Sequence, residues 1–141
     1  MNQVIHVQGL FVNLSPDAFH MWARHYYKCK QDFESPNSFS PVPYFLLCRA
    51  IELEVKSRHL LSKRQSEVKK EFGHDLLEAY EALDQGQKTL NAEEIRVLRV
   101  ANDIYVGKGF EYFNPGHALR GYSQFPDLDE LDSVATKLIS R

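Results

Sequence analysis

The segment from residue 41 to residue 61, PVPYFLLCRAIELEVKSRHLL, constrains the fold more than any other part of the chain. It is the most apolar stretch with helical periodicity. Pro41 and Pro43 suit a first helical turn, because the amides there need no partner within the helix. A helix that is apolar on most sides is stable only when other elements surround it. We therefore expect residues 41–61 to form the central helix of a bundle.

Four further segments show the features of amphipathic helices. The sequence SPD at 15–17 is a typical helix start, and this helix is expected to run to about Lys30. Residues 74–83 are expected to form a third helix. Two more helices should begin at pairs with the spacing of a capping box, which are Asn91–Glu94 and Asp127–Glu130.

The connections between these helices give little sign of strands. Residues 62–73 are polar and suit one or two helical turns that end at Gly73, whereas residues 107–126 are too rich in Gly, Pro and aromatic residues for regular structure. Residues 1–14 alternate loosely and are expected to form an extended N-terminal arm or a short strand. The sequence therefore predicts a single all-α domain over residues 1–141, an up-and-down helical bundle of about five helices.

Composition excludes several classes of protein. The formal net charge of −2 argues against a molecule whose whole surface binds nucleic acid. No stretch approaches the roughly 20 apolar residues of a membrane span, and the N-terminus lacks the features of a signal peptide. The two cysteines form no metal-binding motif, so free thiols in the cytoplasm are expected. The sequence indicates no metal and no cofactor.

A charged row runs along the predicted central helix. At 100° per residue, Arg49, Glu52, Lys56 and His59 share one stripe roughly 80° wide, with apolar residues on both flanks. One interpretation is that this stripe faces water, where a Glu52–Lys56 pair contributes about 0.2–0.5 kcal/mol. The other is that neighbouring helices cover both flanks, so that the stripe lines a partly desolvated groove.

The order of the motifs resembles the HEPN superfamily (higher eukaryotes and prokaryotes nucleotide-binding). The resemblance covers roughly residues 15–115 and begins with the helix pattern Ala-x-Glu-x-x-x-Lys, here Ala50, Glu52 and Lys56. A Gly-His-Asp-Leu turn follows at 73–76. An aromatic segment, often Tyr-Arg-Tyr-Pro in the family, has a loose counterpart in Phe110, Glu111, Tyr112, Phe113 and Pro115.

This resemblance implies a helical bundle that is often dimeric. Many members act in RNA cleavage, in toxin–antitoxin pairs or in phage defence, and others are nucleotide-binding accessory domains. The ribonuclease members carry an Arg followed by a His a few residues later. Here Arg49 and His59, and likewise Arg64 and His74, are separated by nine residues, so the catalytic pair of the family does not carry over.

The best candidate site joins the charged row to the turn at 73–76. If the second and third helices pack antiparallel, His74 approaches the row, and a carboxylate could orient its ring as a base. The alternative is that His74 or its neighbour only caps the third helix. The candidate binding residues are Arg49, Glu52, Lys56, His59, His74 and Asp75; no catalytic residue is assigned.

A basic run between Lys56 and Lys70 carries six bases against one acid. It can contact phosphates without reading sequence, or it can be a solvated link. The candidate phosphate contacts are Lys63, Arg64, Lys69 and Lys70.

Together these features predict a cytoplasmic homodimer that has no catalytic role and binds nucleotide, RNA or a partner protein encoded nearby. The alternatives are a ribonuclease with a nonstandard site around Glu52, Lys56 and His74, and a purely structural dimeric subunit.

Overall fold

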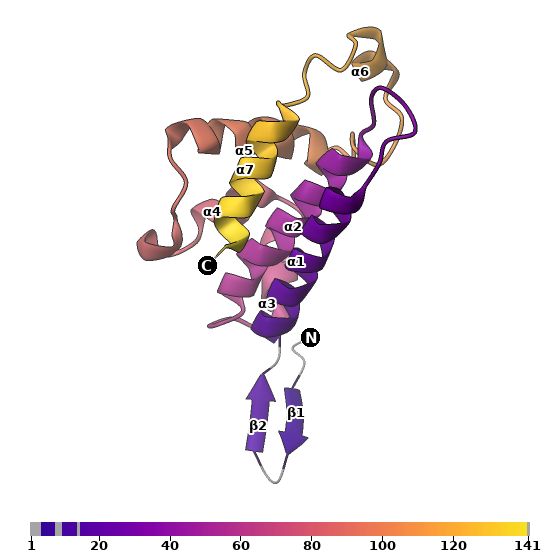
Figure 1. The fold of residues 1–141 in the computed structure, drawn as a ribbon. Coiled ribbons are helices and arrows are strands. Elements are labelled where there is room, and N and C mark those ends of the chain that lie inside the picture. Colours follow the sequence, from indigo (N-terminus) through magenta and orange to yellow (C-terminus); the bar gives the residue numbers. More distant parts are fainter. Residues whose placement is uncertain (1–3, 8–9, 14, 141) are drawn as a thin grey trace.

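The computed structural model describes residues 4–7, 10–13 and 15–140, with the first two of these segments described by their backbone alone. Figure 1 shows a body of helices with a two-stranded hairpin projecting from one end. The elements, in chain order, are β1 (Val4–Val7), β2 (Leu10–Asn13), α1 (Ser15–Asp32), α2 (Val42–His59), α3 (Gln65–Phe72), α4 (Leu76–Glu81), the short 3₁₀ helix η1 (Gln85–Gln87), α5 (Ala92–Val106), α6 (Pro115–Leu119) and α7 (Leu128–Ile139).

The predicted all-α bundle is confirmed, and α2 lies at its centre. Every residue from Ala50 to Leu60 is buried, because α1, α4, α5 and α7 all pack against this helix. In Figure 1, α1, α2 and α7 lie lengthwise beside one another, and α5 runs across them. The main core includes Leu47, Ile51, Val55, Tyr80, Leu98, Leu131 and Leu138.

The helix starts predicted at Asn91 and Asp127 are confirmed, whereas the third helix, expected over residues 74–83, is shorter and spans Leu76–Glu81. Asn91 and Glu94 form a reciprocal capping box, since each side chain accepts a 2.8 Å hydrogen bond from the backbone amide of the other. Asp127 begins α7 and accepts a 3.0 Å bond from the amide of Glu130. These caps satisfy amides that a helix cannot pair internally.

The described part of the chain has seven α-helices, which is more than the expected five. One addition is α3, in the segment expected to hold one or two turns. The other is α6, which lies within residues 107–126 and overturns the expectation that this segment is wholly irregular. Asn114 caps α6 by accepting from the amide of His117, and Pro115 occupies its first turn.

The expected arm contains the β1–β2 hairpin, whose register pairs Val4 with Asn13 and Val7 with Leu10. Residues 1–3, 8–9 and 14 of the expected arm lie outside the described residues. Of the helices described, none combines the length and the apolar character that crossing a bilayer requires.

Candidate functional site

The charged row of α2 is covered rather than open to solvent. Glu52 is 3% exposed and Lys56 is 7% exposed, and Arg49 is half-buried. Covering groups come from the turn between α3 and α4 and from α5, which are far away in sequence. The row therefore lies in the partly desolvated setting of the second interpretation.

Glu52 is the centre of a hydrogen-bonded cluster. Its Oε2 atom lies 3.0 Å from the ammonium of Lys56 and 3.3 Å from Nη1 of Arg49. Its Oε1 atom accepts a 2.6 Å bond from the hydroxyl of Tyr105 and lies 3.0 Å from Nδ1 of His74. Three elements, α2, α5 and the α3–α4 turn, thus place their polar groups on one buried carboxylate.

Lys56 also fixes the turn that carries His74. Its ammonium donates a hydrogen bond to the backbone carbonyl of Gly73. Gly73 has a φ of +54°, which favours glycine because a residue with a Cβ strains the backbone in this conformation. The side chain of His74 remains 65% exposed above this turn: its ring contacts Glu52 and the ring of Tyr105, and most of its surface meets solvent.

The cluster stabilises Glu52 in its ionised form. Burial alone would raise the pKa of Glu52, but the charge of Lys56 and the hydrogen bonds from Tyr105, His74 and Lys56 hold it below its usual value. An ionised carboxylate can only accept, so Nδ1 of His74 carries the proton in this bond. Burial, followed by the nearby charge of Glu52, raises the pKa of Tyr105 far above its usual range.

Two pockets adjoin this cluster and share Arg49 and His74. The first, of about 160 Å³, is lined by Phe45, Arg49, His74, Tyr105, Val106, Lys108 and Glu111. The second, of about 150 Å³, is lined by Phe19, Arg49, Glu52, Leu53, Lys56, Gln65, Val68, Lys69 and His74. Together the two pockets are lined by four side chains with a permanent positive charge and by two carboxylates, so the lining has a net positive charge.

Two candidate residues lie outside this cluster. The Nε2 atom of His59 donates a 2.7 Å bond to the carbonyl of Ala79, and its ring packs on Phe72. Asp75 caps α4 by accepting from the amide of Glu78, and it also accepts a 3.0 Å bond from Asn102. Both side chains join helices of the core, and neither contacts Glu52.

The candidate phosphate contacts are only partly brought to the pockets. Lys69 lines the second pocket. Lys63 is paired with Glu71 at 2.9 Å and lies over the ring of Phe72. Arg64 precedes α3 and Lys70 lies in its last turn, and both are exposed.

Two residues of the site, Tyr105 and Lys108, were not among those expected from the sequence. Tyr105 lies on the apolar face of α5, where its position in the helical pattern suggests an ordinary core residue. Only its long-range contact with Glu52 gives it a polar role. Lys108 follows α5 with a φ of +61° and lines the first pocket.

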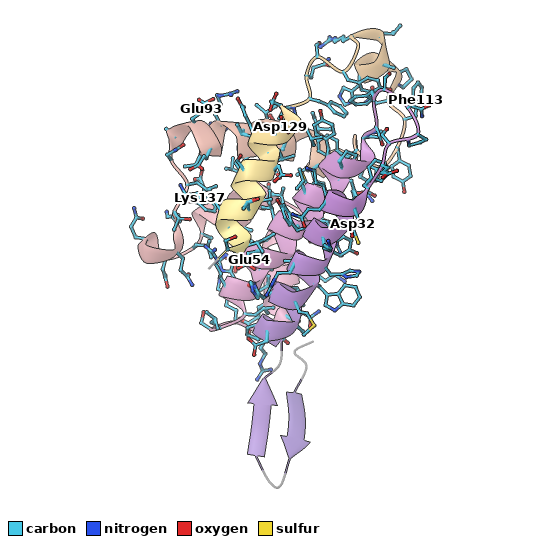
Figure 2. All side chains as sticks on the ribbon, in the orientation of Figure 1. Asp32, Glu54, Glu93, Phe113, Asp129 and Lys137 are labelled. Carbon is cyan, nitrogen blue, oxygen red and sulfur yellow. The ribbon has the colours of Figure 1, made fainter. Side chains whose placement is uncertain are left out.

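A second buried carboxylate lies on the opposite side of α2. Glu54 is fully buried; its Oε2 lies 3.5 Å from Nε of Arg58, and its Oε1 lies 2.5 Å from Nδ1 of His20. Figure 2 shows Glu54 within the body of the helices, beside α7, whereas Glu93 and Asp129 lie at its edge. Arg58 also donates to the carbonyls of Gln87 and Leu138, so this cluster ties α1, α2, η1 and α7 together.

Comparison with known proteins identifies no relative: no family model, no curated protein and no solved structure matches the chain.

Proposed function

We propose that the chain is an HEPN-like helical module without a catalytic role that binds a phosphate-bearing ligand, a nucleotide or an RNA terminus. The observation that carries this proposal is the wall shared by the two pockets, in which Arg49 and His74 are both held by buried Glu52. A guanidinium held in place by a buried carboxylate is preorganised, so less entropy is lost when it binds an anion.

The chemistry of the pockets supports an anionic ligand with an aromatic part. Glu52 already accepts hydrogen bonds from four donors, two of which are cations. Its negative charge is therefore largely compensated, and it repels a phosphate only weakly. Lys56 and Lys69 face the second pocket, and Lys108 faces the first. Phe45 and Tyr105 give the first pocket two aromatic side chains, which suit a base or a sugar.

Support for a binding role over catalysis comes from the state of the polar groups. Lys56 donates to Glu52 and to Gly73, so its ammonium is already engaged. The raised pKa of Tyr105 keeps its hydroxyl protonated and makes it a poor acid. The resemblance to the HEPN superfamily favours a nucleotide as the ligand, and the sequence lacks the Arg/His spacing of its ribonucleases.

Calorimetric titration with adenosine 5′-monophosphate, and with adenosine as its uncharged match, tests the proposal. We expect the monophosphate to bind and adenosine to bind at least tenfold more weakly, with affinity falling as salt rises. Arg49→Ala should lower the affinity at least tenfold, which corresponds to about 1.4 kcal/mol. Arg96→Ala, an exposed arginine of α5, is the matched control. Equal affinity for both ligands, or equal effects of both variants, would overturn the proposal.

A ribonuclease remains a second candidate because of the bond between Glu52 and His74. With the Nδ1 proton directed to the carboxylate, Nε2 of His74 is free of that bond and can act as a base. Incubating the purified protein with a labelled single-stranded RNA tests this function. Suppose that the protein cleaves this RNA, and that His74→Ala abolishes the cleavage but still binds nucleotide. The ribonuclease function would then replace the proposed binding role.

A further inference from the structure

The outer face of α1 carries two metal-ligand side chains beside exposed apolar groups. Helix α1 packs mainly on α2 and touches α7, and its opposite side lies at the edge of the body in Figure 1. Met21 is 67% exposed and Trp22 is 55% exposed on that side. With His25 they line a shallow apolar hollow of about 290 Å³. Cys29, also exposed, follows His25 by one helical turn.

The spacing of His25 and Cys29 matches that of two ligands on one zinc ion. Their Nε2 and Sγ atoms lie 3.9 Å apart. Zinc binds sulfur at about 2.3 Å and imidazole nitrogen at about 2.0–2.1 Å, so a tetrahedral angle places these two atoms about 3.6 Å apart. The two atoms already face one another across this gap, and a small change in side-chain rotamers brings them to the required distance.

This chain supplies only half of such a site. The described residues contain no group of three or more His, Cys, Asp and Glu side chains that could hold a metal. A structural zinc site needs four ligands, so two must come from elsewhere. A second copy related by a two-fold axis presents the same His25 and Cys29 and completes a Cys₂His₂ set.

We propose that two copies of this chain bind one zinc ion between their α1 helices, through His25 and Cys29 of each copy. Binding displaces the thiol proton of each Cys29 to solvent, and each His25 coordinates through Nε2 in its neutral form. The same contact covers Met21 and Trp22, which lie about one helical turn before His25 and would face the α1 helix of the second copy. The inference does not rest on the nucleotide site, which lies on α2, α5 and the turn before α4.

Mass measurement by light scattering, with the full chain reduced by a non-thiol phosphine, tests this proposal. We expect the mass to double when half an equivalent of Zn²⁺ is added, and to return to that of one chain with excess EDTA. Substituting Co²⁺ should give the near-ultraviolet band of a cobalt–thiolate bond. Cys29→Ser should remove that band and the dimer, while buried Cys48 remains as an internal control.

The remaining outcomes each decide against the site. A chain that stays monomeric with Zn²⁺ and gives no thiolate band excludes it. A dimer that forms equally in His25→Ala and Cys29→Ser excludes these ligands, even if the α1 face is an interface. A ratio of one Zn²⁺ ion per monomer would show that the ion is not shared between two copies. Both substitutions are at exposed positions, and an unchanged circular dichroism spectrum confirms that the variants fold.

Discussion

The hydroxyl of Tyr105 donates a 2.6 Å hydrogen bond to the carboxylate of Glu52, across 53 positions of sequence. This bond joins the last part of α5 to the middle of α2 at the floor of the proposed nucleotide site. It gives a buried carboxylate a neutral donor in addition to its cations, and it holds the aromatic wall of the first pocket in place.

Tyr105→Phe removes this donor and leaves the ring in position. A hydrogen bond to a charged, buried acceptor contributes about 1.5–3 kcal/mol, so we expect a loss of that size in the free energy of unfolding. Urea denaturation measures it. Tyr112→Phe, at a tyrosine that is 66% exposed, should leave the stability unchanged. An equal loss in both variants would show that the bond contributes nothing of its own.

Glu52 should make stability depend on acidity. Its pKa in the folded chain lies below its unfolded value, so the contribution is fully present above the unfolded pKa, about 4.3, and is lost as the pH falls through the folded pKa. The stability difference between wild type and Glu52→Gln should therefore be constant above about pH 5.5 and shrink below about pH 4.5. Urea titrations from pH 7 to pH 3.5 measure it, and a difference that grows on acidification contradicts the prediction.

Arg58 should be the most costly arginine to replace. Its guanidinium is 8% exposed, and it bonds two carbonyls beside buried Glu54. Arg58→Ala removes a cation that lies beside the buried carboxylate of Glu54, so we expect a loss of about 3–5 kcal/mol in the free energy of unfolding. Arg58→Lys keeps the charge but not both carbonyl bonds, and it should lose less. Arg96→Ala, at the surface, should leave the free energy of unfolding almost unchanged, because an exposed ion pair contributes little.

Substitutions of the neighbouring residues Asp75 and His74 should affect different properties, namely stability for Asp75 and ligand affinity for His74. Asp75→Ala removes the cap of α4, so we expect a loss of about 1 kcal/mol in stability with unchanged affinity for adenosine monophosphate. His74→Ala should weaken the affinity with a smaller effect on stability, because its side chain is largely exposed. Denaturation and calorimetry on both variants measure this crossed pattern. A loss of affinity in Asp75→Ala would place that carboxylate in the binding site.

The sequence predicted the local features well, because they depend on neighbouring residues. The cap at Asn91 needs only a glutamate three residues later, and the charged row needs only the helical period. The short helix α6 had a comparable signal in Asn114 followed by Pro115, which the surrounding glycines and aromatic residues obscured.

The contacts across the bundle could not be predicted in the same way. Glu52 and His59 share one stripe of α2, yet α5 and the α3–α4 turn cover the first, while the backbone of α4 lies against the second. Which helix covers which turn depends on how all the apolar faces pack together. Helical periodicity gives the direction of each face but not its partner.

The bond between Lys56 and the carbonyl of Gly73 joins the loop before α4 to the middle of α2, so the conformation of the loop depends on the facing helix. A designer who grafts the His74 loop onto another scaffold must carry along a lysine from the facing helix and a glycine. A Cβ at position 73 would meet no atom within 4 Å, so backbone strain rather than crowding disfavours other residues there.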